Sequence, residues 1–328
     1  MENKCGYKKQ ADTNEIRKMS ANELQQLLIK RYSDKVSKMN RSLICSELES
    51  IATTSLPLYN ENNSCYIDAV LVALLYPILT HGCTLTWYKY LLKRKIDSEN
   101  AILIRNELLD VLQNIEHISK MEDADHKTCT NIRKIFKKYK NYNKNHDNEW
   151  IRAQQDPVDV IYMLEHIFEI PDVNEFDLSN NSKEKSSLIG IQIQPYTLKY
   201  NDNVLFRQVF PSFKDPDTKI KRTYVKGSMI YIQINRNFNN DEKIKKEFKP
   251  SRKSKLFVLQ SIILHIGNQP TSGHYVSVMK VNSKTWVYYD DLSDKLEYFS
   301  DKDLFTYKNG IVLANCTGLL YIRPKNIL

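Results

Sequence analysis

Residues 60–75 read NENNSCYIDAVLVALL, a polar turn followed at once by an apolar run that begins at Cys65. The run is apolar on nearly every face, which is typical of a helix buried in the centre of a domain. Cys65 therefore stands at the first turn of a central helix, where unpaired backbone N–H groups and the helix macrodipole stabilise a thiolate. The segment alone also fits a buried structural cysteine, and it does not decide between the two.

The six cysteines are scattered without a CxxC pair, which favours free thiols over a disulfide framework. His81 with Cys83 and His126 with Cys129 are the nearest candidates for a zinc site, and neither has four ligands at close spacing. We therefore expect no metal and no cofactor. The start is polar, and the longest apolar run, residues 69–79, is too short to span a bilayer. We expect a soluble, intracellular chain in the cytoplasm, with the nucleus as an alternative.

The hydrophobic pattern changes character along the chain. Residues 1–54 predict a helical extension, opened by capping-box spacing at residues 20–23. Asp156 followed by Pro157 predicts the start of another helix, which continues to residue 170.

After about residue 185, β-branched and aromatic runs predict strands, and residues 179–185 predict a loop. The runs are residues 229–236, 256–266, 274–281, 285–290 and 318–323. Helices first and strands second favour an α+β domain with a largely antiparallel sheet.

The net charge of +9 raises the alternative of a nucleic-acid-binding module. Residues 243–255 hold seven Lys or Arg, but aromatic residues do not alternate with them as in a stacking platform. A solvated basic loop is the better interpretation. The bias towards Lys, Asn, Ile and Tyr is typical of AT-rich genomes, such as those of large DNA viruses.

A histidine and two carboxylates lie on consecutive predicted strands. His274 opens one strand, and Asp290 and Asp291 end the next, so an Asp–His hydrogen bond across the hairpin is geometrically easy. The order Cys65, His274, Asp290 is that of the papain-like nucleophile, base and orienting group. Each segment also has a plain alternative, either a structural histidine or a solvated hairpin turn.

Together these segments resemble the ubiquitin-specific protease family over roughly residues 55–325. The resemblance rests on five segments in the family's order: residues 60–75, 154–159 (QQDPVD), 230–238, 262–291 and 318–323. It implies a papain-like α+β fold for residues 55–328, with a helical thumb, reduced fingers and an antiparallel-sheet palm. Their expected bounds are about 55–175, 176–228 and 229–328.

The resemblance also implies roles for individual residues. Cys65 would be the nucleophile, His274 the general base and acid, Asp290 the orienting group and Asn60 the oxyanion donor, with Asp291 able to substitute in part. The implied substrate-binding residues are Gln155, Asp156, Asp159, His265, Gly273 and Tyr275. The two aspartates among these fall where acidic residues grip the basic C-terminal tail of ubiquitin; they also suit a helix cap and a first-turn carboxylate. Tyr275 also suits a packing role.

Four positions depart from the family's pattern. Asn62 replaces a usual Gly, and Asn tolerates positive φ well enough for the turn to survive. Ser64, Asp68 and Asp159 replace a usual Thr, Asn and Glu, and none of these changes removes a catalytic group. The fingers bind zinc through paired CxxC in many relatives, whereas residues 176–228 hold no cysteine here. We therefore expect short, metal-free fingers.

The implied function is hydrolysis of the bond after the C-terminal glycine of ubiquitin, with ubiquitin and ubiquitinated proteins as partners. Two alternatives share the fold: a catalytically weak ubiquitin-binding scaffold and a protease for another ubiquitin-like modifier. We expect a monomer with no membrane partner.

Overall fold

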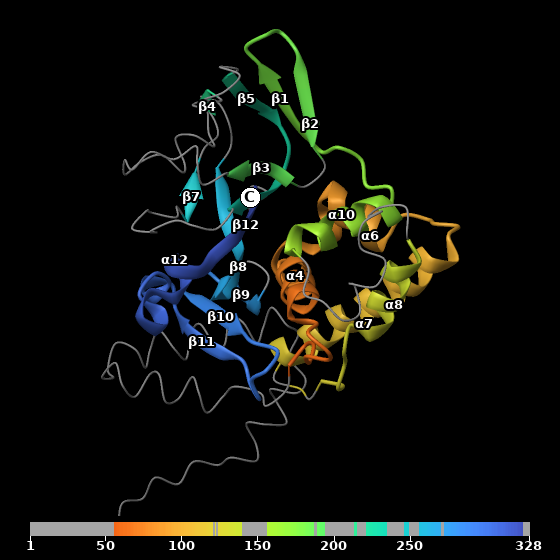
Figure 1. Cartoon of the computed structure of the whole chain (residues 1–328), viewed down its shortest axis with the longest axis vertical. Coiled ribbons are helices and arrows are strands. Elements are labelled where there is room, and N and C mark those ends of the chain that lie inside the picture. Colours follow the sequence, from red (N-terminus) through yellow and green to blue (C-terminus); the bar gives the residue numbers. More distant parts are fainter. Residues whose placement is uncertain are drawn as a thin grey trace, which may run out of the picture.

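The computed structural model describes residues 56–120, 122, 124–139, 156–186, 189–193, 213–214, 221–234, 246–248, 256–269 and 272–323. The predicted helical extension, residues 1–54, and Gln155 lie outside this part of the chain. Within it, the longer helices come first and the strands follow, as predicted, although the short helix α12 (Ile311–Asn315) precedes the last strand. The longer helices and the strands lie side by side (Figure 1).

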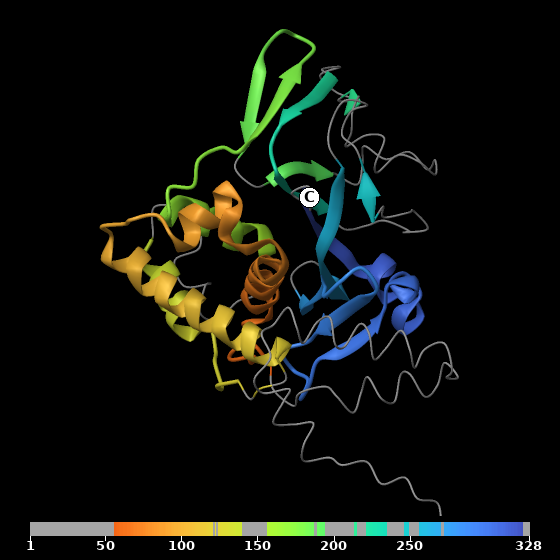
Figure 2. The same cartoon turned by 180° about the vertical axis from the view of Figure 1, so that it is seen from behind.

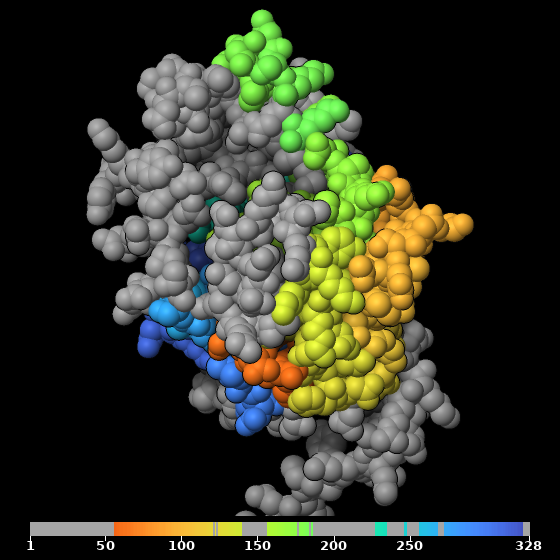
Figure 3. Space-filling view, turned by 45° about the vertical axis from the view of Figure 1, so that its right-hand side comes forward, coloured from red at the N-terminus to blue at the C-terminus, as the bar shows by residue number. Residues whose placement is uncertain are grey.

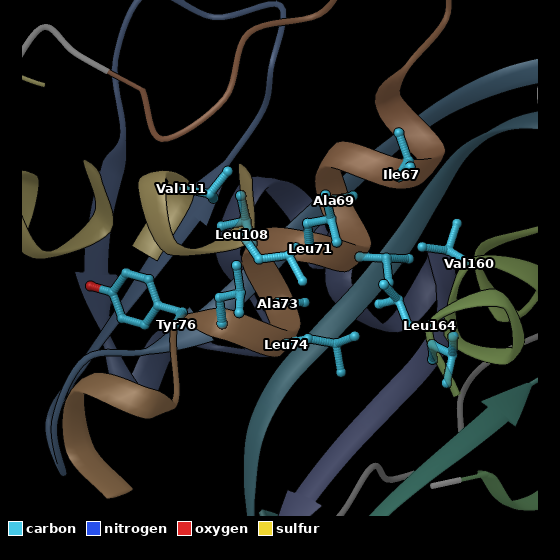
Figure 4. Packing of buried hydrophobic residues seen from close by; sticks show 14 of the residues in the cluster. Ile67, Ala69, Leu71, Ala73, Leu74, Tyr76, Leu108, Val111, Val160 and Leu164 are labelled. Carbon is cyan, nitrogen blue, oxygen red and sulfur yellow. The ribbon is translucent and has the colours of Figure 1, made fainter. Parts of the chain in front are cut away.

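Helix α4 (Cys65–Leu75) forms the centre of the fold, and all of its residues are buried. It packs against helices α7 (Glu99–Ser119) and α10 (Pro157–Ile167), and against strands β8 (Phe257–Gln269) and β9 (Ser272–Lys280). Figure 4 shows its apolar side chains between Leu108 and Val111 of α7 and Val160 and Leu164 of α10. Because helix α4 has neighbours on every side, an apolar residue is favoured at almost every position.

Helix α4 together with the short helices that follow it, from Cys65 to Thr84, has the length and composition of a membrane-crossing helix. Most of it is buried inside the fold, which is the property of a core helix. The hydroxyl of Ser261 on β8 donates to Ala73 O at 2.7 Å and joins the helix to the sheet.

The helices that precede residue 170 lie together on the side of the sheet where α4 packs (Figure 1). Helix α10 begins as predicted, with Asp156 Oδ1 accepting from Val158 N at 2.9 Å and Pro157 in the first turn. It ends at Ile167, three residues earlier than predicted, before Glu169 adopts a φ of 48°. The remaining α-helices of this group are α5 (Ile78–His81), α6 (Thr86–Leu92) and α8 (Thr130–Lys138).

The main sheet has the order β11-β10-β9-β8-β12-β6-β3, with β7 also paired to β8. Its pairs are antiparallel except for β3 and β6. The remaining bounds are β3 (Ile189–Ile193), β6 (Met229–Ile234), β7 (Glu247–Phe248), β10 (Thr285–Tyr289), β11 (Glu297–Ser300) and β12 (Cys316–Ile322). One face of the sheet packs on α4, and the other packs beside the short helix α12 (Ile311–Asn315). Because both faces of the sheet are covered, the central strands have apolar residues on both faces. The predicted α+β fold with a largely antiparallel sheet is confirmed.

A second sheet, of order β2-β1-β5-β4, extends away from the body of the protein (Figure 2). It contains β1 (Asn174–Leu178), β2 (Lys183–Ser186), β4 (Phe213–Lys214) and β5 (Lys221–Lys226). The hairpin of β1 and β2 forms the green projection in Figure 3. These strands fall almost entirely within the range expected for the fingers, although the boundaries between thumb, fingers and palm stay predictions.

The predicted loop at residues 179–185 is wrong for its second half, because residues 183–186 form β2. The turn itself is shorter, and Asn181 adopts a φ of 66° within it. Strand β2 is at the edge of its sheet, and Lys183 and Lys185 are exposed. An edge strand of this kind needs no apolar alternation, so its sequence carries no strand pattern.

Candidate active site

The turn that leads to Cys65 is held in an unusual backbone conformation. Asn62 and Asn63 have φ angles of 56° and 60°, in the left-handed region that asparagine tolerates better than most residues. The expectation that Asn62 can take the place of a glycine is therefore confirmed. Ser64 accepts a hydrogen bond on Oγ from Glu61 N at 2.9 Å, which closes the turn.

Residues of helix α8 and the segment before it form hydrogen bonds with this turn. Glu61 O accepts from an Arg133 guanidinium nitrogen at 2.8 Å. The Glu61 carboxylate accepts from the hydroxyls of Thr128, at 2.7 Å, and Thr130. These bonds fix the backbone immediately before the cysteine. Cys65 then begins α4 and is almost completely buried, with 4% of its surface exposed.

His274 lies on β9, next to the strand β10, and the two carboxylates directly follow β10. Its Nε2 lies 2.7 Å from Oδ1 of Asp290, which directly follows β10. Asp290 Oδ1 also accepts from Leu292 N at 3.0 Å, so the carboxylate itself is held in place. Burial opposes ionisation of Asp290, but the bonds from His274 and Leu292 hold the pKa of this carboxyl below its usual range.

The Cys65 side chain lies within hydrogen-bonding range of His274. Since Nε2 faces Asp290, the other ring nitrogen, Nδ1, is the one available to the thiol. Burial alone would lower the pKa of His274, but the hydrogen bonds with Asp290 and Cys65, together with the negative charges of Asp291 and Asp290, raise it to about 10. The raised pKa favours the charged form of the imidazole at neutral pH.

Asn60 and Asp291 form a second pair beside the first. Asn60 Nδ2 donates to Asp291 Oδ2 at 2.9 Å, and Asn60 N donates to Asp291 O at 3.2 Å. An amide nitrogen carries two hydrogens, so one remains for a developing oxyanion. Asp291 Oδ1 is 3.5 Å from His274 Nε2, beyond good hydrogen-bonding distance. The structure therefore gives Asp290 the contact with the histidine and gives Asp291 the contact with Asn60.

The three side chains His274, Asp290 and Asp291 offer ligand atoms within 4.8 Å of one another, close enough to hold a cation. The hydrogen bond between His274 Nε2 and Asp290 already uses the nitrogen that would face such an ion. Cys65 and Asn60 lie beside the same three groups.

Residues 57–297 match the family model "Ubiquitin carboxyl-terminal hydrolase". The chain belongs to the ubiquitin carboxyl-terminal hydrolase family. It is a thiol-dependent deubiquitinase of the ubiquitin-specific protease type, as the sequence predicts. One similar solved structure is described as "Structure of the SAGA Ubp8/Sgf11/Sus1/Sgf73 DUB module bound to ubiquitin aldehyde". The TM-score is 0.47 at 11% identity, over 93% of this chain and 76% of that chain. The family assignment therefore rests on the sequence match.

The acidic positions of this deubiquitinase lie at the start of α10. Asp156 is exposed, caps the helix and accepts from Gln233 Nε2 at 3.1 Å through Oδ2. Asp159 is half-buried in the first turn. Gln233 is not predictable as a site residue, because a glutamine in an apolar strand is recognisable only when its partner across the fold is known.

Three further predicted substrate-binding residues lie along the β8–β9 hairpin. His265 is fully buried, and its ring lies 4.4 Å from that of Tyr275, which is itself buried. Gly273 is exposed with a φ of 145°, and a Cβ there would lie 2.7 Å from His265 Nε2. In this conformation Gly273 faces solvent, while the two rings support the backbone that carries His274.

Proposed function

We propose that this deubiquitinase cleaves the isopeptide or peptide bond after the C-terminal glycine of ubiquitin through Cys65, His274 and Asp290. The observation that supports the proposal is the position of His274, which has Asp290 on one ring nitrogen and Cys65 within reach of the other. Three segments that are far apart in the sequence supply a nucleophile, a proton carrier and an orienting carboxylate.

The reaction begins when the Cys65 thiolate attacks the carbonyl carbon of the terminal glycine. Asn60 Nδ2 and a backbone N–H near Cys65 meet the charge that develops on the oxygen, and one such donor contributes about 3 kcal/mol in acyl transfer. His274 gives its proton to the leaving lysine amine. Breakage of the C–N bond leaves ubiquitin joined to Cys65 as a thioester. The same histidine then takes a proton from a water molecule whose oxygen attacks the thioester carbonyl carbon. The C–S bond breaks, which releases the ubiquitin carboxyl group and restores the Cys65 thiolate beside the charged His274. Asp290 holds the imidazole in one orientation throughout.

In this proposal, Asp156 and Asp159 bind the basic C-terminal tail of ubiquitin. Asp156 keeps its helix-capping bond and its bond with Gln233 while remaining exposed, so capping and substrate binding are compatible. Two carboxylates on the first turn of α10 supply the local negative potential that arginines in a substrate tail require. The family's name supports ubiquitin as the modifier.

Hydrolysis of isopeptide-linked diubiquitin tests the proposal. The wild-type chain should release monomers, and Cys65→Ala should release none while still binding ubiquitin. Cys83→Ala is the matched control, because Cys83 is a half-buried free thiol outside the site. A chain that binds ubiquitin without turnover would be the scaffold. Preferential cleavage of another ubiquitin-like modifier in parallel reactions would overturn the assigned substrate.

A further inference from the structure

A second buried carboxylate lies close to the proposed catalytic residues. Asp68 is in the first turn of α4, three residues after Cys65, and is completely buried. Its Oδ2 accepts a hydrogen bond from the Ser64 hydroxyl. Its Oδ1 is buried without a hydrogen-bond donor among the residues that the structure describes. An ionised carboxylate rarely persists in such a place.

Asp291, like Asp68, has a hydrogen-bond donor for only one of its two carboxylate oxygens in the described part of the chain. Only 1% of its side chain is exposed, and Oδ2 accepts from Asn60. In the described part of the chain, its Oδ1 also has no hydrogen-bond donor. The Asp68 and Asp291 side chains lie within hydrogen-bonding range of each other. Each carboxyl group therefore has one satisfied oxygen and one buried oxygen left over.

Two ionised carboxylates repel each other and cannot form a hydrogen bond, whereas one proton between them removes the repulsion and satisfies both groups. Burial raises the pKa of both carboxyls, and the charge of Asp291 raises that of Asp68 further. The surroundings decide which group keeps the proton. Asp291 accepts from Asn60 and faces the charged His274, and both contacts favour its ionised form.

Asp68 faces partners that do not favour its charge as strongly. Its neighbours are the Ser64 hydroxyl and the Cys129 thiol, and burial raises the pKa of that thiol, which stays neutral. The nearby cation Arg133 has other partners. Its guanidinium carbon lies 5.9 Å from the centroid of the Tyr66 ring, and the guanidinium donates a hydrogen bond to Glu61 O. The acidic proton therefore belongs on Asp68.

We propose that Asp68 carries a proton, donates it in a hydrogen bond to Asp291, and thereby holds Asp291 in the place where it positions Asn60 beside Cys65. Asp68 is a positioning residue, because it acts through Asp291 and does not touch the substrate. The inference rests on the proposed function for its catalytic consequence, but the protonated carboxyl exists whether or not ubiquitin is the substrate.

Infrared spectroscopy tests the proton directly. At neutral pH, the difference spectrum between the wild-type chain and Asp68→Asn should contain the carbonyl stretch of one protonated carboxyl group. Asp294→Asn, an exposed aspartate in the loop that follows Asp291, is the matched control and should retain the band. If the wild type lacks the band, or if Asp68→Asn keeps it, the shared proton is contradicted. This experiment needs no substrate, so its outcome is independent of the proposed function.

Kinetics test the positioning role. An asparagine at position 68 can donate to Asp291 and accept from Ser64, as a protonated aspartate does. Asp68→Asn should therefore lower kcat by no more than about threefold. Asp68→Leu can do neither and should lower kcat by about tenfold or more, with little change in KM. Asp291→Asn should be worse than Asp68→Asn, since it removes the charge beside His274.

Equal losses in Asp68→Asn and Asp68→Leu would contradict the donor role, as would an unimpaired Asp68→Leu. Circular dichroism and thermal unfolding check that each variant folds. If Asp68→Leu does not fold, the comparison of Asp68→Asn with Asp291→Asn decides, and equal losses there overturn the assignment of the proton. Wild-type protein that shows the infrared band but does not cleave ubiquitin would contradict the proposed function and leave the proton pair standing.

Discussion

His274 Nε2 lies 2.7 Å from Asp290 Oδ1 but 3.5 Å from Asp291 Oδ1. The two carboxylates that directly follow β10 therefore have different partners. Asp290 is bonded to the imidazole, whereas Asp291 turns inward to Asn60. For Asp291 to replace Asp290 in part, as expected from the sequence, its buried side chain would have to move closer to the His274 ring.

Asp290→Asn should lower kcat by about 10²- to 10⁴-fold, because an amide can present its N–H to Nε2 and favour the wrong tautomer of His274. Steady-state hydrolysis of a fluorogenic ubiquitin substrate measures the loss. Asp294→Asn makes the same change of charge on the surface of the following loop and should leave kcat unaltered. Activity of Asp290→Asn within about threefold of wild type would remove Asp290 from the proposed mechanism.

Asn60→Ala should lower kcat by about 10²-fold and leave ubiquitin binding largely intact, because the lost amide acts on charge that develops only in the transition state. Kinetics combined with calorimetric titration of ubiquitin separates the two quantities. A collapse of binding with an unchanged kcat would show that Asn60 has a structural role.

The charged form of His274 should persist far into the alkaline range. Its pKa of about 10 in the folded chain exceeds the ordinary value of about 6.5, so proton binding stabilises the fold below about pH 6.5. That contribution is lost as the pH rises through about 10. NMR titration of the His274 ring should show the raised value, and Asp290→Ala should shift it downward. Titration near 6.5 in the wild type would contradict the ion pair.

Gly273→Ala should destabilise the fold and displace His274. The added Cβ would lie 2.6 Å from Ile266 O and 2.7 Å from His265 Nε2, at a φ of 145°. Gly82→Ala is the control, because Gly82 also has positive φ but its Cβ would meet only Thr84, at 4.0 Å. Thermal unfolding should show a loss of about 1–3 kcal/mol beyond that of the control. Equal losses of stability in the two variants would mean that the hairpin backbone shifts to accommodate a Cβ at position 273, which contradicts the prediction.

Asp159→Asn should raise KM for a ubiquitin substrate by about three- to tenfold with little change in kcat, since the charge contributes to binding and not to chemistry. Higher salt should shrink the difference, because the residue is half-buried and incompletely shielded from solvent. A fall in kcat at constant KM would instead assign the residue a role in positioning α10 and the helix that it packs against.

The central helix and the five core strands were predictable because their patterns are local. Apolar residues on every face of residues 65–75 predict burial, and β-branched runs predict strands wherever packing does not override them. Residues 183–186 were not predictable as a strand, since an exposed edge strand needs no apolar face and its pairing with β1 is a property of the whole sheet.

The proposed catalytic groups, with Asp290 as the partner of His274, were predictable from their order and from the resemblance, but the contact between Asp291 and Asn60 was not. Nothing in the dipeptide of Asp290 and Asp291 indicates that the second carboxylate turns inward to Asn60. The pairing of Asp68 with Asp291 joins residues 223 positions apart and depends on burial that only the folded chain defines. Likewise, the bond between Gln233 and Asp156 becomes visible only when β6 lies beside the start of α10.

Reaction with ubiquitin that carries an electrophile at its C-terminus tests the central claim most directly. Mass spectrometry of the digested adduct should place the cross-link on Cys65, and the adduct should disappear in Cys65→Ala, persist in Cys83→Ala and form much more slowly in His274→Ala. A cross-link on any other cysteine, or an adduct that forms at the wild-type rate without His274, would contradict the account.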